Sequence, residues 1–332
     1  IGSGGMGDVY LAEHNLIKRK VAIKSLHSNL VKNTDFITRF RKEGETLAGL
    51  DHPNIVRLNE YLEHDGGLYL IMEFIEGIQL DTYIKNETGP IAEKELVPLF
   101  SQVLDAITYA HQKDIIHRDI KPSNIFVTSD KKIKILDFGI AKLASENKGI
   151  TKTGVQVGTV TYMSPEQVKG VNVDKLTDIY SLGVTLFQMA VGKVPYDNTN
   201  AFNTQMQIVN EPFPKASEFY PGVSKKIEAI ILKASQKDKN DRYQSCKEFK
   251  KDLNSKKIVV TEIEKPKNPK QPKKPKVVEK KRRFNTGKYV FYLVLFLVIG
   301  LFLYYNDNII EQIKPDTELL GCTDKDATNY NS

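Results

Sequence analysis

The amino-acid sequence predicts an α+β fold with a small β-rich N-terminal lobe and a larger helical C-terminal lobe, followed by one transmembrane helix. Strand and helix patterns alternate over about the first 70 residues, whereas helical patterns dominate from about residue 93. Residues 289–305 contain no charged side chain. We therefore expect a bilobal domain over residues 1–255, a linker over 256–288, a membrane helix over 289–305 and a tail over 306–332.

The N-terminal lobe is predicted from apolar strands and one helical stripe. Residues 9–11 are expected to continue as a strand, and residues 21–26 and 68–73 are rich in Val, Ile, Leu and Tyr, as buried strands are. Between the last two runs, apolar residues recur at helical spacing at Phe36, Phe40, Leu47 and Leu50.

The C-terminal lobe is predicted from two helices and two short strands. Residues 182–190 are apolar almost all round, which indicates a helix buried inside the lobe. Residues 125–127 and 133–136 are short apolar strands, and residues 144–157 lack periodicity and are interpreted as a mobile loop. An amphipathic helix is indicated by Leu96, Phe100, Val103, Leu104 and Ile107.

The positive charge of the chain is confined to one segment. The net charge is +7, but residues 256–288 hold 13 Lys and Arg against 3 acidic residues. Residues 306–332 hold 2 Lys against 6 acidic residues, so residues 1–255 are left with a net charge of +1. A nearly neutral folded body gives no basis for a nucleic-acid partner, and none is expected.

The basic segment is predicted to be a stiff linker. Pro266, Pro269, Pro272 and Pro275 fall at every third position among lysines, a spacing that suits polyproline II. A ligand for a proline-binding partner domain is the alternative.

The predicted membrane helix contains 17 residues, 289–305. At 1.5 Å per residue it spans roughly 26 Å, close to the hydrocarbon thickness of a bilayer. The basic cluster at 280–283 with Lys288 places the N-terminal side in the cytoplasm and the tail outside the plasma membrane. A core helix of a C-terminal domain is the alternative, although few residues remain to pack around it.

The chain opens with Ile1-Gly-Ser-Gly-Gly-Met-Gly-Asp-Val9, in which Gly2, Gly4 and Gly7 form a G-x-G-x-x-G pattern. A G-x-G-x-x-G pattern alone also occurs in dinucleotide-binding folds, where a helix follows it. Here strands follow, which favours a hairpin whose backbone N–H groups approach a phosphate.

A lysine and a glutamate are predicted to pair inside the small lobe. Lys24 lies within the apolar run 21–26, and Glu43 falls at the centre of the apolar face of the helical stripe. Because a buried carboxylate needs a cation, Lys24 is the expected partner of Glu43.

The densest set of reactive side chains lies in His117-Arg-Asp-Ile-Lys-Pro-Ser-Asn124, followed by Asp137-Phe-Gly139. Asn124 and Asp137 offer the hard oxygen ligands that Mg²⁺ prefers, and Asp119 can accept a proton from an attacking hydroxyl. Lys121 adds an ammonium to the same loop.

Taken in order, these motifs resemble the protein kinase family over residues 1–255. The run continues with Gly158-Thr-Val-Thr-Tyr-Met-Ser-Pro-Glu166, Asp178 and Arg242. The residues Tyr-Met-Ser-Pro-Glu-Gln at 162–167, and the order of kinase, linker and membrane helix, are most similar to those of bacterial transmembrane serine/threonine kinases.

The resemblance implies ATP and Mg²⁺ as cofactors, with Mn²⁺ as a second candidate cation. Lys24 holds the α and β phosphates, Lys121 neutralises the γ-phosphate, and Asp119 orients the substrate hydroxyl. Lys24, Glu43, Asp119, Lys121 and Asn124 form the implied catalytic set, and Asn124 and Asp137 the implied metal ligands. The implied ATP-binding residues are Ile1, Gly2, Ser3, Gly4, Gly5, Met6, Gly7, Val9, Ala22, Lys24, Met72 as gatekeeper, Glu73, Ile75 and Phe126.

The resemblance also implies a substrate class and a structural frame. Lys121 and Thr159 match serine/threonine enzymes, so the expected partners are proteins that present Ser or Thr. Glu166 and Arg242 are implied to form a buried ion pair, and Asp178 to brace the catalytic loop. Ser164 stands where the family often has Ala. The alternative is a pseudokinase scaffold that binds nucleotide and partners without transfer.

Regulation is expected at Thr151 and Thr153, beside Lys148 and Lys152. A phosphate there adds roughly −1.5 to −2 charge and can pair with the Arg118 guanidinium. A membrane that holds many copies together favours self-association and phosphorylation in trans. A plain polar loop is the alternative.

The ends of the chain are the least informative parts. The start at Ile1, inside a motif, suggests that an N-terminal stretch is missing. Residues 321–331 are similar to the opening of short repeats of bacterial surface proteins, with Asp324, Asp326 and Asn329 as Ca²⁺ candidates or as an acidic tail. Cys246 and Cys322 show no metal or redox spacing.

Overall fold

The computed structural model describes residues 1–4, 7–27, 37–38, 41, 44–45, 48–138, 160–196 and 200–256. The chain divides into two units, residues 1–263 and 264–332, and every described residue lies in the first. Within the described ranges, no helix is long and apolar enough to cross a bilayer. The predicted membrane helix at 289–305, the linker and the tail lie outside these ranges.

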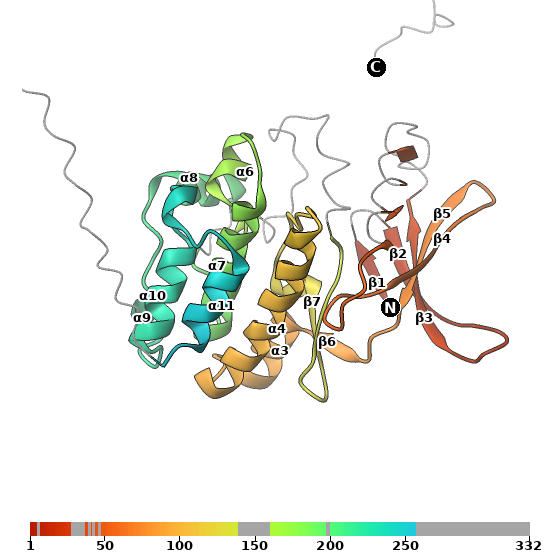
Figure 1. Cartoon of the computed structure of the whole chain (residues 1–332), viewed down its shortest axis with the longest axis horizontal. Helices are drawn as coiled ribbons and strands as arrows, with labels where there is room; N and C mark the ends of the chain where they lie inside the picture. Colours follow the sequence, from red (N-terminus) through yellow and green to blue (C-terminus); the bar gives the residue numbers. More distant parts are fainter. Residues whose placement is uncertain are drawn as a thin grey trace, which may run out of the picture. The chain divides into compact units, whose positions relative to one another are not determined.

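A five-stranded antiparallel sheet forms the small lobe, with strand order β1-β2-β3-β5-β4 (Figure 1). β2 contains the predicted strand 9–11, and β3 and β5 confirm the two predicted buried strands. β4 was not predicted, because all of its residues are exposed or half-buried. The strands are β1 (Gly2–Gly4), β2 (Gly7–Glu13), β3 (Lys20–Leu26), β4 (Leu58–His64) and β5 (Gly67–Glu73).

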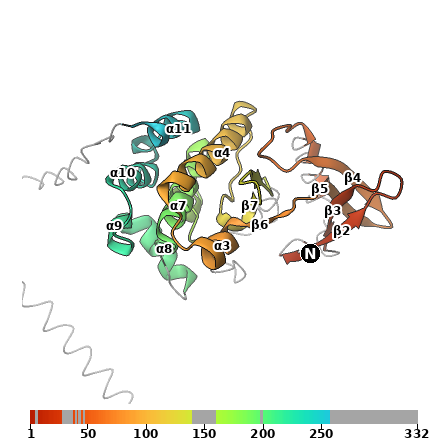
Figure 2. The same ribbon diagram turned by 90° about the horizontal axis from the view of Figure 1, so that it is seen from below.

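A second, three-stranded sheet lies beside helix α4 (Glu93–Gln112) of the large lobe (Figure 2). Ile55 forms a parallel bridge with Ile135, and the Val56 amide donates to the Ile135 carbonyl at 2.9 Å. The segment that precedes β4 is thereby tied to the large lobe. The strands are β6 (Gly77–Gln79), β7 (Ile125–Thr128) and β8 (Ile133–Ile135), in the order β6-β7-β8.

The large lobe is built around α4 and α7 (Lys175–Val191), which confirm the two predicted helices. Almost every residue of α7 is buried, and Gly183 lets α10 approach: a Cβ there would lie 2.4 Å from Ser235 Oγ. Among the described residues, the other α-helices are α3 (Leu80–Tyr83), α6 (Pro165–Lys169), α8 (Ala201–Asn210), α9 (Ala216–Phe219), α10 (Lys225–Ala234) and α11 (Cys246–Asn254). The same part of the chain contains three short turns of other helix types, η1 (Ile84–Thr88), η2 (Pro122–Asn124) and η4 (Lys239–Asp241).

Candidate active site

The glycine-rich segment forms the expected hairpin. β1 pairs with β2, with Gly4 opposite Gly7. A Cβ at Gly7 would lie 1.8 Å from the Ser25 carbonyl oxygen, so only glycine fits there. Gly5 and Met6 lie outside the described residues, as does the side chain of Ser3.

Lys24 is buried in β3, and its ammonium donates to Asp137 Oδ1 at 2.8 Å. This contact joins the small lobe to the segment after β8, across 113 residues of sequence. The expected partner Glu43 lies outside the described residues, so the Lys24–Glu43 pair stays a prediction. Asp137 itself has a left-handed backbone, with φ of 54°.

The strand register brings the predicted adenine wall together. Ala22 of β3 lies directly opposite Met72 of β5, next to the connection between the lobes. The Glu73 amide donates to the Arg57 carbonyl at 2.9 Å, so a purine contact at Glu73 must use its carbonyl oxygen. Both carboxylate oxygens of Glu73 accept from Lys134 Nζ at 2.8 Å.

The four other predicted adenine contacts differ in exposure. Val9 and Ile75 are half-buried, while Ile1 is exposed. Phe126 is half-buried on β7, opposite Gln79 on one side and Lys134 on the other.

Two side chains of the loop 117–124, which we call the catalytic loop, converge on the Asp119 carboxylate. Lys121 Nζ lies 3.0 Å from Asp119 Oδ2, and Asn124 Nδ2 donates to the same oxygen at 3.0 Å and to the Asp119 carbonyl at 2.8 Å. Asn124 is fixed because it ends the turn η2 and its own carbonyl accepts from the Leu136 amide at 2.9 Å. The Asp119 carboxylate is therefore held between two donors, Lys121 and Asn124.

Asp178 braces this loop from α7, as the resemblance implied. Its carboxylate, fully buried, accepts from the backbone amides of His117 at 2.9 Å and Arg118 at 2.8 Å. Arg118 adopts a left-handed φ of 64°, a conformation that costs about 1 kcal/mol or more and needs such support. His111 Nε2 lies 2.7 Å from the same carboxylate and was not predicted from sequence.

A second unpredicted support comes from the start of α6. Ser164 and Gln167 form a capping box, with the Gln167 amide donating to Ser164 Oγ and the Ser164 amide to Gln167 Oε1. Gln167 Nε2 then donates to the Arg118 carbonyl at 3.0 Å. The Ser-x-x-Gln spacing was visible in the sequence and explains why Ser is favourable at position 164.

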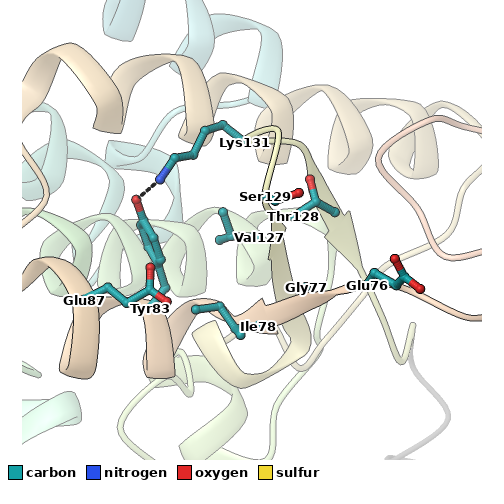
Figure 3. Close-up of a pocket in the computed structure, with 9 residues that line it drawn as sticks. All are labelled: Glu76, Gly77, Ile78, Tyr83, Glu87, Val127, Thr128, Ser129 and Lys131. Atoms are coloured by element: carbon teal, nitrogen blue, oxygen red, sulfur yellow. Dashed lines mark hydrogen bonds between the residues drawn. The ribbon is translucent and has the colours of Figure 1, made fainter.

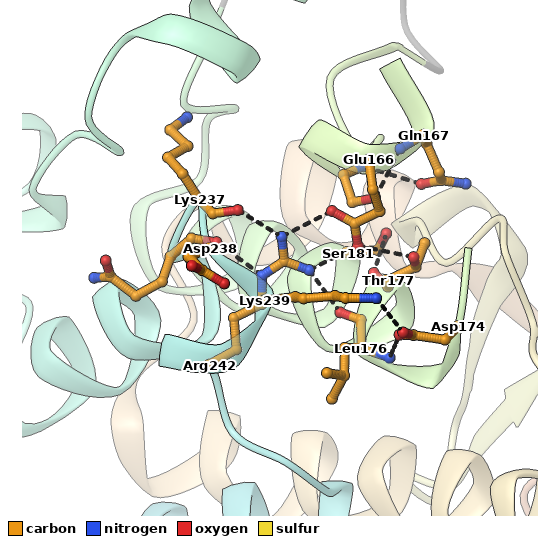
Figure 4. Close-up of polar contacts among 12 residues, drawn as sticks. Glu166, Gln167, Asp174, Leu176, Thr177, Ser181, Lys237, Asp238, Lys239 and Arg242 are labelled. Carbon is orange, nitrogen blue, oxygen red and sulfur yellow. Dashed lines mark hydrogen bonds and ion pairs between the residues drawn. The ribbon is translucent and has the colours of Figure 1, made fainter. Parts of the chain in front are cut away.

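The ion pair between Glu166 and Arg242 is present and buried (Figure 4). The guanidinium donates to both Glu166 oxygens at 2.8 and 2.9 Å, and Thr177 Oγ1 donates to Glu166 at 2.8 Å. Burial raises the pKa of Glu166, but the hydrogen bonds and charge of Arg242 outweigh it and lower that pKa to about 2.

The set of oxygen donors fits a divalent cation. Asn124 Nδ2 is committed to Asp119, so its Oδ1 is the atom available to a metal, and Asp137 supplies a carboxylate with one oxygen on Lys24. Oxygen donors of this kind suit Mg²⁺ or Mn²⁺. Among the described residues, no cluster of three or more His, Cys, Asp or Glu side chains could hold a metal ion.

A separate surface pocket lies beside β6, α3 and the β7–β8 hairpin (Figure 3). Lys131 donates to Tyr83 Oη there and lies 2.9 Å from Glu95. None of the predicted site residues lines this pocket, so it does not belong to the candidate active site.

The expected regulatory threonines, Thr151 and Thr153, lie outside the described residues, as does Thr159. Arg118, their expected partner, lies in the catalytic loop with its backbone held on both sides, by Asp178 and Gln167.

Comparisons with known proteins agree with this geometry. A model of the protein kinase domain matches residues 1–253. The chain is 41% identical over 253 residues to serine/threonine-protein kinase PrkC of Bacillus subtilis and 36% identical over 259 residues to serine/threonine-protein kinase PknB of Mycobacterium tuberculosis. These alignments cover 76% of this chain and 39% and 41% of those proteins. The crystal structure of the Mycobacterium tuberculosis PknI kinase domain aligns with a TM-score of 0.61 at 29% identity, covering 76% of this chain and 92% of that one.

Proposed function

The chain belongs to the protein kinase family, and we propose that it is an ATP-dependent serine/threonine kinase of proteins, anchored to a membrane by one helix. The observation that carries the proposal is the convergence of Lys121 and Asn124 on Asp119, with Lys24 bonded to Asp137. The chain spans about two fifths of the length of the curated relatives it matches. Its activity, substrates and partners are therefore proposals.

The chemistry follows from the atoms in the site. A substrate Ser or Thr hydroxyl attacks the γ-phosphorus, the bond to the β-phosphate oxygen breaks, and ADP leaves. Asp119 orients the hydroxyl and accepts its proton, while Lys121, 3.0 Å from Asp119, lies where it can neutralise the transferring phosphoryl group. Lys24 would bind the α and β phosphates. Mg²⁺ held by Asn124 and Asp137 would supply charge neutralisation on the phosphates.

Membrane attachment rests on sequence. The uncharged segment 289–305 and the basic residues before it support a single-pass protein with the kinase domain, residues 1–255, in the cytoplasm and the tail outside. Reporters fused after residues 255 and 320 of the full chain should report cytoplasmic and extracytoplasmic locations. Two cytoplasmic reporters would contradict the anchor and leave the kinase assignment intact.

Activation by phosphorylation of Thr151 and Thr153 is part of the proposal. Lys148 precedes these threonines and Lys152 lies between them, and the Arg118 side chain belongs to the loop 117–124. A phosphate that reaches this loop would bring charge-assisted hydrogen bonds to the substrate side of the site. Mass spectrometry should find phosphate at these threonines in active protein and none in Asp119→Asn protein.

The deciding experiment is transfer of labelled γ-phosphate from ATP to a Ser/Thr-containing protein, followed by phosphoamino-acid analysis. We expect phosphoserine or phosphothreonine, and a loss of about 10²- to 10⁴-fold in Asp119→Asn, because the proton acceptor is removed. Nucleotide binding without any transfer by the wild-type chain would instead support a scaffold. Transfer by Asp119→Asn at the wild-type rate would show that another residue is the acceptor.

A further inference from the structure

The turn between β2 and β3 presents two apolar side chains to solvent. Leu16 is 87% exposed and Ile17 is 61% exposed. Figure 1 shows this turn projecting beyond the sheet of the small lobe. We call residues 14–20 the basic turn, because Leu16 and Ile17 are followed directly by Lys18, Arg19 and Lys20.

The basic turn is closed by its own hydrogen bonds. The His14 amide donates to the Arg19 carbonyl at 2.8 Å, and the Lys18 amide donates to the His14 carbonyl at 2.9 Å. His14 Nδ1 accepts from the Leu16 amide at 3.3 Å. The two apolar side chains therefore sit on a defined backbone and need little ordering to bind a surface.

The cations of the basic turn remain available to an external anion. Lys18 lies 3.4 Å from Glu13 and Lys20 lies 2.9 Å from Glu76, but more than half of each of these four side chains is exposed. Exposed pairs of this kind are weak and exchange readily for another partner. Glu13, Glu76 and the three cations of the turn together carry a net charge of +1, so the tip is positive.

We infer that the basic turn inserts Leu16 and Ile17 into the interface of an anionic lipid bilayer, with Lys18, Arg19 and Lys20 at the headgroups. Apolar side chains beside lysine and arginine are the combination that binds such interfaces. A second copy of this chain is a poorer occupant, because the like charges of two such turns would repel. The inference rests on the proposed membrane anchor.

Because the proposed anchor already holds the chain at the membrane, a weak contact between the basic turn and lipid is enough to dock the small lobe. The predicted linker has 33 residues, which reach from about 30 Å as a flexible coil to about 100 Å as polyproline II. A domain tethered at that distance meets the bilayer at millimolar effective concentration or nearly so. The small lobe would then be docked with its β2–β3 turn toward the lipid.

The chain contains no tryptophan, so one introduced indole reports on one place. Leu16→Trp protein, full length, is mixed with vesicles of phosphatidylcholine alone or with phosphatidylglycerol, each with and without brominated chains. The matched control is Phe202→Trp on α8, which is equally apolar and 60% exposed but lies in a helix without charged residues. We expect a blue shift and bromine quenching for Leu16→Trp in anionic vesicles only, and neither for Phe202→Trp.

Charge removal tests the other half of the inference. Lys18→Gln/Arg19→Gln in the Leu16→Trp background should weaken the quenched state about 30-fold, since each cation near an anionic surface strengthens binding about fivefold. Vesicle flotation after carbonate extraction reports the anchor separately. If the protein floats after carbonate extraction but the indole of Leu16→Trp is not quenched, the lipid contact of the basic turn is contradicted and the anchor is supported. If the indole is quenched but flotation does not survive carbonate, the lipid contact is supported and the anchor is contradicted. A shift that depends on protein concentration and not on lipid assigns the turn to a second copy and overturns the inference.

Discussion

Two buried cations, Lys24 in the small lobe and Arg242 in the large lobe, are bonded very differently. Arg242 donates all five of its N–H groups: two to Glu166 and the others to backbone carbonyls of Leu176, Gln236 and Lys237. In the part of the chain that the structure describes, the Lys24 ammonium has one carboxylate partner, Asp137, for three N–H groups.

The difference separates a structural cation from a functional one. A guanidinium whose donors are all used cannot bind a ligand, and its removal leaves a buried carboxylate alone. An ammonium beside a carboxylate that can bind a metal ion is placed to bind phosphate oxygens. The comparison predicts that Arg242 governs stability, whereas Lys24 governs transfer.

The largest expected effect is that of Arg242→Leu on stability. The change strands Glu166, whose side chain is 9% exposed, and should lower the free energy of unfolding by about 3–5 kcal/mol. Urea denaturation checks it. The double variant Glu166→Gln/Arg242→Leu should regain part of the loss because no buried charge remains. A single-variant loss below about 1 kcal/mol would remove Arg242 from its structural role.

Lys24→Met should lower the rate of phosphoryl transfer. Losing one positioned donor at the phosphates typically costs about 10²- to 10³-fold in rate, or roughly 2.7–4 kcal/mol of barrier. The melting temperature should change far less than in Arg242→Leu. Lys20→Met is the matched control, since Lys20 lies on the same strand but is exposed and pairs with Glu76. Equal rates for both variants would contradict the comparison.

The Glu166–Arg242 pair should also set part of the acid sensitivity. The pKa of Glu166 is about 2 in the folded chain against 4.5 ordinarily, so its contribution is complete above about pH 4.5 and declines as pH falls toward 2. Between pH 6 and pH 3 the loss should be about 2 kcal/mol. The difference in unfolding free energy between wild type and Glu166→Gln isolates it. A difference that stays constant down to pH 3 would contradict the pKa shift.

What the sequence could predict was mostly local. Asp119, Lys121 and Asn124 lie within six positions on one loop, so their convergence follows from the loop itself. β3 and β5 were predicted because they are apolar, whereas the exposed strand β4 carries no such pattern.

Partners distant in sequence were the harder part. Helical geometry predicted Glu43 as the partner of Lys24. No pattern in the sequence around Lys24 indicates the contact with Asp137 that the structure shows. The lysine at 134 looks like an ordinary surface residue on a short strand, yet it pairs with Glu73 across 61 residues. Such pairs depend on how the two lobes and their sheets meet, which periodicity does not encode.

The smallest effect is expected from that last pair. Lys134 lies on β8 of the large lobe and Glu73 ends β5 of the small lobe, so their ion pair spans the connection that the adenine ring is proposed to touch. Its side chains are 17% and 35% exposed, which places the pair between a buried and a surface one. Lys134→Gln should therefore loosen the nucleotide site by about 0.5–1 kcal/mol.

This loosening should raise KM for ATP about two- to fivefold while leaving kcat within about twofold, because Lys134 touches none of the catalytic residues. Lys132→Gln is the matched control on the same hairpin, where Lys132 pairs with Asp130 in solvent. If Lys134→Gln lowers kcat and leaves KM unchanged, the ion pair acts on the transfer step. Lys134 would then be a functional cation like Lys24 and not a structural one like Arg242. If neither parameter moves, the pair is a surface contact only.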